Sequence, residues 1–544
     1  MKPNALISVY DNTGIVEFAR ELVALGWNII SSGGTAKVLR EADIEVRDVA
    51  ELVGGGAILG HRVVTLSREV HAGLLARYNV PEDVTEMEKL GIPYLDLVCV
   101  DLYPLEVEIA KPNATRDSVI EKTDIGGPTM LSSAAKGRRI VICDSVDRSR
   151  VVSWLELRKP NEADFITELC AKADGMVAGY RLASARCHSQ GAIDGMVGTR
   201  VAACKYGENA WQTPAGLYST GSSDPLALDK FELVQGVPLS YVNWCDVDRM
   251  LLTMTHALAA TATNSGSIPC FAVGVKHGNP CGCAISKGGY VPGTDPNELY
   301  VETLQRMVSG DVRAIFGGFV MTNFTLEEAT AGALLTHAMP KGQRRLLDGI
   351  VAPGFTDGAK EILKRKGDKC RLLVNPALAE VNDLSLDQAT RLRYVRGGFL
   401  AEPNYTFVPR INHLVKFGEW NLDKADDVLV AWAVGSTSNS NTITLVKDRM
   451  LIGNGVGQQD RVGAAKLALQ RACDAGHDVH GAVAYSDSFF PFPDGPKILA
   501  EAGVKLIMAS SGSVKDKEVQ AACAKHGVTF LLVPDSEGRG FFGH

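Results

Sequence analysis

The chain has 544 residues, of which 46% are hydrophobic and 22% are charged, and its formal net charge is −7. This length exceeds a single hydrophobic core and predicts about three domains of ordinary size or two larger ones, and the 55 glycines are typical of a loop-rich α/β enzyme. The negative charge argues against a protein that binds nucleic acid or an anionic membrane.

The sequence gives no sign of export or of a metal site. It contains no run of 18 apolar residues and no basic leader, and its N-terminus enters a strand at once, so we expect a cytoplasmic protein. The 12 cysteines form no C-x-x-C pair and are expected to be reduced and mostly buried. The segment Pro280–Cys283 follows His277 as in zinc deaminases, but that chemistry needs H-x-E and P-C-x-x-C, so no metal is expected.

The first 200 residues alternate between predicted strands and helices. Apolar runs predict strands at residues 5–9, 27–31, 95–100 and 139–143, and amphipathic runs predict helices at residues 13–25 and 36–42. Such alternation predicts a parallel sheet flanked by helices, with reactive loops at the carboxyl ends of the strands. We place a domain boundary within residues 192–203, which gives domains 1–196 and 197–544.

The second domain has short apolar runs that predict further strands. These lie at residues 271–275, 314–320, 428–434, 482–485 and 505–508. The segments 271–282 and 428–441 look like equivalent parts of a duplicated unit, although no periodic identity between them establishes a duplication.

Three strand ends in the first domain carry groups suited to nucleotide chemistry. The turn Ser32-Gly33-Gly34-Thr35 joins a strand to a helix, where free N–H groups attract phosphate, although a plain turn is an equally good interpretation. Tyr103 follows a strand, Asp124 opens a glycine-rich turn, and Lys136 lies on the next predicted helix. A phenol, a carboxylate and an ammonium could move protons during a ring closure, but each alone is more often structural.

The segment from Lys276 to Gly282 is the most informative part of the second domain. A buried run ending at Val275 delivers Lys276, His277 and Asn279 to a Pro/Gly turn. A fixed cation, a group that titrates near neutrality and an amide are what acyl or formyl transfer requires. For an isolated Lys-His pair, a solvated lysine beside a structural histidine is the commoner case.

Six segments of the first domain follow one another in the order of a known family: S-V-x-D-x-T-G, S-G-G-T, G-x-R-V-x-T-L, D-L-Y-P, D-I-G-G-P-T and S-A-A-K. The chain thus resembles the bifunctional AICAR transformylase/IMP cyclohydrolase family of purine biosynthesis. The K-H-x-N-P-C-G core at Lys276 matches this family fully. The resemblance implies an α/β protein: a methylglyoxal-synthase-like first domain, a duplicated cytidine-deaminase-like second domain without zinc, and a homodimer with shared sites.

The resemblance also implies roles for individual residues. Tyr103, Asp124 and Lys136 would close the purine ring, the glycine-rich turn would hold the phosphate, and Arg62 and Thr65 would contact the nucleotide. In the transfer from 10-formyltetrahydrofolate to AICAR, His277 would handle the proton, while Lys276 and Asn441 would stabilise the oxyanion or protonate the folate nitrogen. Substrate and folate contacts are implied for Lys205, Tyr206, Asn279, Phe316, Gly317, Arg461, Phe489, Pro491, Asp494 and Arg539.

Several positions depart from the family pattern. Val64 and Asn12 stand where the family has lysines, and Ser67 stands where it has a histidine. Losing one such cation costs about 3–4 kcal/mol of transition-state stabilisation, so we expect ring closure to be slower than formyl transfer. Arg68 could partly substitute for the lysine at 64, and the C-terminal motif from Arg539 to His544 is one residue longer than in the family.

Two other functions fit parts of the pattern. The chain could be a monofunctional transformylase with a degenerate first domain. It could also be a non-catalytic nucleotide sensor, since methylglyoxal-synthase-like domains also bind phosphate allosterically. The intact K-H-x-N-P-C-G core favours the enzyme, because a sensor has no need of it.

Overall fold

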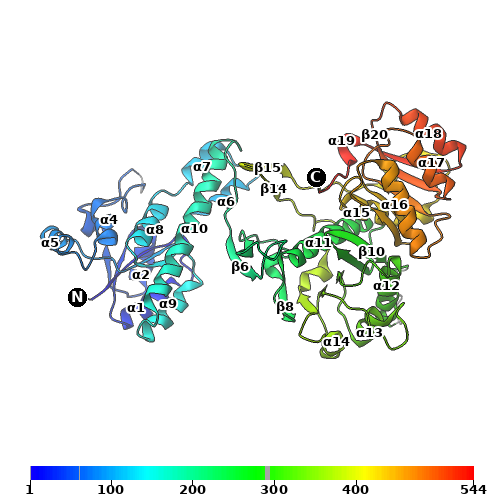
Figure 1. Ribbon diagram of the computed structural model, residues 1–544. Coiled ribbons are helices and arrows are strands. Elements are labelled where there is room, and N and C mark those ends of the chain that lie inside the picture. Colours follow the sequence, from blue (N-terminus) through cyan, green and yellow to red (C-terminus); the bar gives the residue numbers. More distant parts are fainter. Residues whose placement is uncertain (1, 60–61, 288–294, 544) are drawn as a thin grey trace. The chain divides into compact units, whose positions relative to one another are not determined.

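The computed structural model describes residues 2–59, 62–287 and 295–543. Its contacts divide the chain into two compact units, Met1–Thr199 and Arg200–His544 (Figure 1). The predicted domains place this division slightly earlier, at 196/197. No helix in the described ranges is long and apolar enough to cross a membrane.

The first unit is built on a five-stranded, fully parallel sheet. Its strand order is β3-β2-β1-β4-β5. The strands are β1 (Asn4–Ser8), β2 (Asn28–Ser31), β3 (Val46–Asp48), β4 (Leu97–Val100) and β5 (Ile140–Ile142). The central strands are buried on both faces, which explains why they read as continuous apolar runs. The predicted parallel sheet is confirmed.

Helices cover both faces of this sheet. They are α1 (Ile15–Ala24), α2 (Gly33–Glu41), α3 (Val49–Val53), α4 (Arg68–Leu75), α5 (Pro81–Leu90), α6 (Leu105–Ile109), α7 (Arg116–Glu121), α8 (Gly126–Lys136), α9 (Asp147–Glu156) and α10 (Glu162–His188). One apolar cluster joins the sheet to α1, α2 and α9, and a second joins it to α3, α4 and α8. The long helix α10 contributes Leu169 to the first cluster and Ala173 to the second. The carboxyl ends of the strands stay clear for the loops that carry polar groups.

The second unit contains a twelve-stranded mixed sheet, and its two halves have equivalent strand orders when each is followed from its edge to the centre. The order is β16-β21-β20-β19-β17-β18-β10-β9-β11-β12-β13-β8. The strands are β8 (Glu232–Gln235), β9 (Phe271–Lys276), β10 (Asn279–Ile285), β11 (Phe319–Thr322), β12 (Gly349–Ala352), β13 (Arg371–Val374), β16 (Val415–Phe417), β17 (Ile443–Lys447), β18 (Met450–Gly455), β19 (Val483–Ser486), β20 (Leu506–Ser511) and β21 (Thr529–Pro534).

Each half of this sheet has the same pairing. The hairpin β9–β10 corresponds to β17–β18, the parallel strands β11, β12 and β13 correspond to β19, β20 and β21, and the antiparallel edge β8 corresponds to β16. The strands β10 and β18 meet at the centre. This symmetry of order and direction supports the duplicated unit that was predicted, while its likeness to cytidine deaminase stays a prediction.

The helices of the second unit repeat the same symmetry. They are α11 (Tyr241–Ser265), α12 (Pro296–Gly310), α13 (Glu328–Thr336), α14 (Asp357–Leu363), α15 (Ala425–Ser436), α16 (Arg461–Asp474), α17 (Asp494–Glu501), α18 (Asp516–Lys525) and α19 (Asp535–Gly538). The largest apolar cluster joins α11 and α15, and two outer clusters hold α12–α14 and α16–α18. Each half therefore supplies one central helix and three outer ones, and the short α19 follows β21.

Two sequence predictions in this unit are wrong. The apolar run 428–434 is part of helix α15 and not a strand, so the segment equivalent to β9–β10 is β17–β18 and not 428–441. The strand predicted at 314–320 begins only at Phe319. Helix α15 is buried on every side, and a fully buried helix shows no polar face by which it differs from a buried strand.

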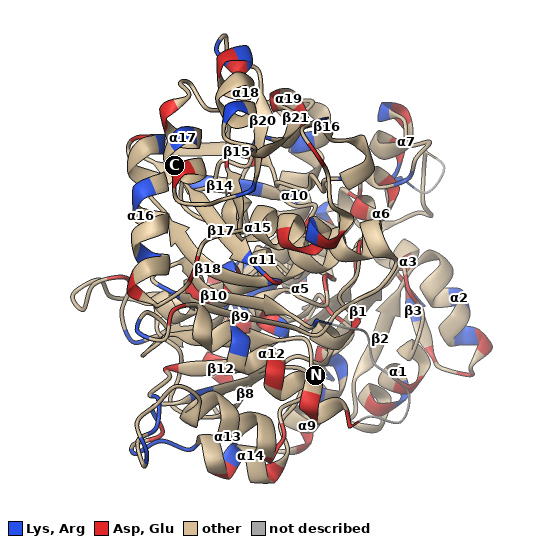
Figure 2. Ribbon diagram, turned by 90° about the vertical axis from the view of Figure 1, so that its right-hand side faces the viewer, with Lys and Arg blue, Asp and Glu red and all other residues tan. Residues whose placement is uncertain are grey.

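Short elements complete the second unit. The hairpins β6–β7 (Thr199–Cys204 and Ala215–Ser219) and β14–β15 (Thr390–Val395 and Gly398–Pro403) lie outside the main sheet. Single 3-10 turns occupy Leu228–Lys230, Pro376–Glu380, Ile411–His413 and Leu422–Lys424. Charged residues gather on helices and loops and are sparse on the central strands (Figure 2).

Candidate active sites

The hairpin turn between β9 and β10 presents the Lys-His pair. Lys276 pairs with Asn279 across a two-residue turn, and both central residues have positive φ, 50° at His277 and 69° at Gly278. This is the backbone of a primed turn, which favours Asn-Gly, so a histidine at the first central position is unusual. The buried strand ends at Val275, and the His277 side chain is exposed at the tip.

Lys276 is fixed against the loop that precedes β11. Its Nζ donates a hydrogen bond to the carbonyl of Phe316 at 2.7 Å. The neighbouring Gly317 has φ 74°, and a Cβ at this position would lie 3.9 Å from Lys276 Nζ. Lys276, Phe316 and Gly317, to which the family resemblance assigns roles in the site, therefore lie close together.

A carboxylate on α11 supports the turn from below. Asp246 is 5% exposed, and its Oδ1 accepts the Gly278 N–H at 2.8 Å. Burial raises the pKa of Asp246, while the charges of His277 and Arg249 act to lower it. Sequence analysis missed this residue, although helical spacing places it one turn before the buried Met250.

Asn279 links the first turn to the loop before β17. Its Oδ1 accepts the backbone N–H of Asn439 at 3.1 Å. Two residues further on, Asn441 exchanges backbone hydrogen bonds with Gln458, and its side-chain Nδ2 donates to the Gln458 carbonyl at 2.8 Å. The structure thus places Asn441 in a loop that is tied directly to the Lys276–Asn279 turn.

A cavity of about 330 Å³ adjoins this turn. Lys276, His277 and Asn279 line it together with the Asp311–Arg471 ion pair, whose atoms are 3.6 Å apart. This volume lies at the lower end of the range of small-molecule sites.

Arg461 is buried and held by the protein itself. Its guanidinium pairs with Asp487, and it donates to Ser486 Oγ at 3.1 Å and to the Phe489 carbonyl at 2.9 Å. The other oxygen of Asp487 accepts the Thr442 N–H at 3.1 Å. Asp487, another residue that sequence analysis did not single out as functional, therefore connects Arg461 to the loop of Asn441.

The C-terminal arginine lies among aromatic rings. The Arg539 guanidinium carbon is 5.9 Å from the Phe489 ring centroid and 5.1 Å from that of Phe541, and Arg539 also pairs with Asp535. Arg539 and Phe541 line a second cavity of about 730 Å³. His544, the end of the predicted motif, lies outside the described residues.

For the other residues that were predicted to contact substrate or folate, the structure shows only local features. Asp494 begins α17 and is exposed, with Oδ1 accepting the Gly495 N–H, and Pro491 is also exposed. Lys205 Nζ lies 5.7 Å from the Tyr206 ring centroid in the turn after β6.

In the first unit, Ser32–Thr35 joins β2 to the N-terminus of α2. Ser32 is the N-cap, and Gly33 and Gly34 are exposed. Thr35 Oγ1 donates to the Val9 carbonyl at 3.1 Å and accepts the Val9 N–H at 3.2 Å. The turn is therefore anchored to the end of β1, with the glycine N–H groups at a helix terminus that suits an anion.

Tyr103, Asp124 and Thr65 gather at the same edge of the sheet. Asp124 Oδ1 accepts the Gly127 N–H at 2.9 Å, and burial raises the pKa of this carboxyl. Burial and the nearby Asp124 charge raise the pKa of Tyr103. A Cβ at Gly126 would lie 3.0 Å from Thr65 Oγ1, so the turn packs closely on Thr65.

The structure does not bring Lys136 to this group. Asp124 precedes the first residue of α8, whereas Lys136 is its last, so the helix separates them by about 15 Å along its axis. Arg62 pairs with Glu121 on α7, and both side chains are exposed. Among residues 2–59, 62–287 and 295–543, no group of three or more His, Cys, Asp or Glu side chains could hold a metal ion.

The family model described as AICARFT/IMPCHase bienzyme matches residues 134–471, and the model of the MGS-like domain matches residues 14–129. The curated protein "Bifunctional purine biosynthesis protein PurH" of Trichormus variabilis is 33% identical over 539 residues, which cover 97% of this chain and 98% of that protein. The chain belongs to the AICARFT/IMPCHase bienzyme family. A solved structure titled "Crystal structure of ForH" is 32% identical and covers 35% of this chain and 99% of its own, with a TM-score of 0.31, which supports no structural conclusion.

Membership of the bienzyme family confirms the family that the sequence motifs indicated and the MGS-like fold of the first domain. The departures from the family pattern have visible structural consequences. Val64 packs against the apolar cluster beneath α4, Ser67 caps that helix by accepting the Val70 N–H, and Arg68 pairs with Glu69. Where the family has a lysine, the side chain of Val64 therefore packs against the apolar core.

Sequence analysis also missed a residue that fixes the backbone of Asp124. The hydroxyl of Tyr180, on α10, accepts the backbone N–H of Asp124 at 2.7 Å. Tyr180 is 56 positions away in the sequence, and no local pattern connects it to Asp124.

Proposed function

We propose that the Lys276–Asn279 turn and the Asn441 loop form the formyl-transfer centre of this chain. As a member of its family, the chain transfers a formyl group to 5-aminoimidazole-4-carboxamide ribonucleotide (AICAR), giving FAICAR, and cyclises FAICAR to IMP in purine biosynthesis. The observation that carries the assignment is the hairpin tip that exposes His277 beside a fixed Lys276 and a cavity of about 330 Å³.

The chemistry of AICAR explains why these groups suffice. Its 5-amino lone pair is delocalised toward the 4-carboxamide, so attack on a formyl carbon needs a base for the amine proton and donors for the oxyanion. In this proposal His277 accepts that proton, and Lys276 and Asn441 stabilise the oxyanion. The new C–N bond forms first and gives the tetrahedral oxyanion. As this intermediate collapses, the bond to the donor nitrogen breaks and that nitrogen takes up a proton.

The formyl donor in this proposal is 10-formyltetrahydrofolate. The rings of Phe489 and Phe541 beside Arg539 combine apolar faces with a guanidinium. Aromatic faces suit the pterin and benzoyl rings, and a guanidinium suits the glutamate carboxylates. AICAR contacts are proposed for Lys205, Tyr206, Phe316, Gly317 and Arg461.

Ring closure is proposed at the first unit. The N-terminus of α2 with Ser32–Thr35 would hold the phosphate, and Tyr103 and Asp124 would move protons. Val64 supplies no charge, and Lys136 lies at the far end of α8. We therefore expect ring closure to be slower than formyl transfer.

One experiment tests both steps. The protein is given AICAR and 10-formyltetrahydrofolate, and the products are separated with time. Accumulation of FAICAR with slow conversion to IMP is expected. Rapid IMP formation would contradict the slow ring closure, FAICAR alone would identify a monofunctional transformylase, and nucleotide binding without product would identify a sensor.

A homodimer with shared sites is also proposed, and the cytoplasmic location stays a prediction. Sedimentation should show a dimer at assay concentrations, and an active monomer would refute this. Mixing two inactive variants, His277→Ala and Lys205→Ala, should restore part of the activity if each site draws on two subunits.

A further inference from the structure

The loop that follows β1, residues 9–14, connects two parts of the candidate ring-closure site. At its start, Thr35 Oγ1 of the glycine-rich turn donates to the Val9 carbonyl at 3.1 Å and accepts the Val9 N–H at 3.2 Å. The ring of Tyr10, the next residue, lies edge-on to the ring of Tyr103, with the two centroids 5.4 Å apart. A displacement of this loop would therefore disturb both the glycine-rich turn and Tyr103.

Two carboxylates shape this loop. Asp101, which follows β4, accepts the Tyr10 N–H with Oδ1 and the Asp11 N–H with Oδ2, the latter at 3.1 Å. Asp11 in turn accepts the N–H of Thr13 at 2.9 Å and its hydroxyl at 2.7 Å. Residues 9–14 include no lysine or arginine. The loop therefore brings negative charge to the site and no positive charge of its own.

A cation reaches the loop from helix α9. Arg148 Nη1 donates to the carbonyl of Thr13 at 2.7 Å, across 135 positions of the sequence. Arg148 is 7% exposed, and its Nε is buried without a hydrogen-bond partner among the described residues. Burial raises the pKa of Asp101, while the N–H groups of Tyr10 and Asp11 and the charge of Arg148 oppose this rise. Because a buried guanidinium is costly to desolvate, its place beside this loop indicates that its charge has a role.

We propose that Arg148 is a positioning residue for ring closure, which anchors the loop 9–14 through the Thr13 carbonyl and so fixes the position of the Tyr103 ring. This inference rests on the proposed function of Tyr103 in moving protons. The contacts described above run without a gap from the guanidinium, through the loop and its two carboxylates, to the Tyr10 ring that packs on Tyr103. Arg148 acts through this path and touches no substrate.

The substitution Arg148→Met tests the anchor, because it removes the guanidinium and keeps an unbranched side chain. The kcat for ring closure, measured on supplied FAICAR with the full chain, should fall by about 10- to 100-fold, since a displacement of about 1 Å can have such an effect. Formyl transfer by the second unit of the same protein should be unchanged. Arg148→Lys keeps the charge and one donor for the Thr13 carbonyl, and should recover part of the rate.

A substitution at the exposed end of the path avoids a folding defect. Tyr10 is 54% exposed, so Tyr10→Ala should leave the unit folded while it removes the ring that packs on Tyr103. Ring closure should slow in this variant as well. Tyr10→Phe keeps the ring and should retain the wild-type rate.

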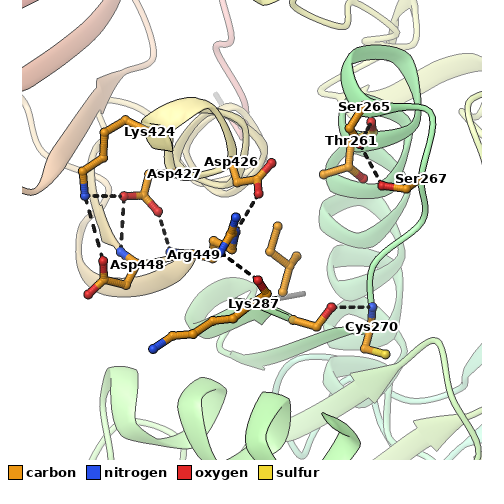
Figure 3. Close-up of polar contacts among 12 residues, drawn as sticks. Thr261, Ser265, Ser267, Cys270, Lys287, Lys424, Asp426, Asp427, Asp448 and Arg449 are labelled. Carbon is orange, nitrogen blue, oxygen red and sulfur yellow. Dashed lines mark hydrogen bonds and ion pairs between the residues drawn. The ribbon is translucent and has the colours of Figure 1, made fainter. Parts of the chain in front are cut away.

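Two other arginines serve as matched controls. Arg139 is 5% exposed and donates from Nε to the Leu74 carbonyl at 2.8 Å, but it lies at the amino end of β5, away from the strand ends that carry the site. Arg449, in the second unit, donates from Nη1 to the Lys287 carbonyl at 3.1 Å (Figure 3). Arg139→Met should lower the melting temperature, and both Arg139→Met and Arg449→Met should keep the wild-type kcat for ring closure.

Hydrogen exchange gives a readout that does not depend on activity. The backbone amides of Tyr10, Asp11 and Thr13 are bound to the two carboxylates, so they should exchange slowly in the wild type. They should exchange faster in Arg148→Met and at the wild-type rate in Arg449→Met.

The outcomes distinguish this inference from the proposed function. If Tyr103→Phe abolishes ring closure while Arg148→Met and Tyr10→Ala both keep the wild-type kcat, the inference is overturned and the proposed function stands. If Arg139→Met slows ring closure as much as Arg148→Met, the effect is not specific to the loop and the inference also fails. If the wild type makes no IMP from FAICAR, the proposed function of the first unit fails, and the exchange rates decide whether Arg148 anchors the loop.

Discussion

The Asn279 side chain accepts a hydrogen bond from the backbone N–H of Asn439, a residue 160 positions away in the sequence. The bond joins the turn of one half of the duplicated sheet to the loop that enters the other half. Asn454 adds a second link by donating to the carbonyl of Pro280 and to the hydroxyl of Ser438, both at 3.0 Å. His277 and the Asn441 loop therefore belong to one hydrogen-bonded unit.

Asn279→Ala should destabilise this unit. The Asn439 N–H, which is part-buried, would lose its partner at a cost of about 1 kcal/mol, and the distance between His277 and Asn441 would no longer be fixed. Denaturant unfolding should show the loss in stability, and kcat should fall with it. Asn279→Asp keeps the acceptor oxygen and should recover most of the stability. Equal losses in both variants would contradict this explanation.

His277→Ala should lower formyl-transfer turnover by roughly 10²–10⁴, as loss of a positioned acid–base does. Since the side chain is exposed at the turn, the melting temperature should change little. The control is Asp448→Ala, at the equivalent tip of the hairpin β17–β18, which should keep its activity. A folded His277→Ala variant with wild-type turnover would disprove the assignment.

Asp487→Ala should be strongly destabilising. Asp487 is 0% exposed and Arg461 8% exposed, so removing the carboxylate leaves a buried, uncompensated cation. Such changes cost about 3–5 kcal/mol. Chemical denaturation measures the loss. The exposed pair Lys497–Glu501 serves as comparison, and Glu501→Ala should change stability by less than about 1 kcal/mol. Similar losses in the two variants would show that burial of the Arg461–Asp487 pair does not make its loss more costly than that of an exposed pair.

Asp124→Asn should separate stability from activity. Burial raises the pKa of this carboxyl, so its stabilising contribution is present below the unfolded pKa of 3.8 and is lost as pH rises through the folded pKa. At pH 7 the charged group is therefore unfavourable, and the amide variant should melt higher, with a gain that shrinks as pH falls. Ring closure, measured on supplied FAICAR, should be largely lost. Asp117→Asn, on the exposed surface of α7, should alter neither.

Val64→Lys tests whether the lack of a cation at this position slows ring closure. A lysine at this position would restore a cation near Thr65 and Asp124 and should speed the conversion of FAICAR to IMP. Because Val64 packs on the core, the change should also lower stability slightly. Val64→Met carries the packing change without the charge and should not speed the reaction. If the wild type is already fast and Lys136→Ala abolishes the activity, another cation replaces the missing lysine.

The parallel sheet of the first unit could be predicted because four of its five strands lie in continuous apolar runs. The edge strand β3 was not predicted, because its sequence Val46-Arg47-Asp48 is not an apolar run. The helix α15 could not be predicted, because Val428–Val434 is buried on all sides and the run has no polar face. The Lys276–His277 turn was found because its chemistry is contiguous in sequence. Asp246, Asp487 and Tyr180 were missed because their contacts with the sites depend on the tertiary fold.

Lys136 illustrates a different limit. Lys136 is the last residue of the S-A-A-K segment, on the helix that follows Asp124, and the family resemblance implies that the two residues share a site. The rise of an α-helix places the two at opposite ends of α8. A motif thus identifies family membership more directly than it identifies which side chains meet.

The seam between β10 and β18 has a consequence for how the second unit can be divided. Each of these strands is the inner border of its own half, and each covers the unpaired backbone groups of the other. A fragment that ended between the halves would present a bare sheet edge, which is a template for self-association. The fused arrangement keeps both borders covered from the moment the chain folds, so neither half is suited to an independent existence.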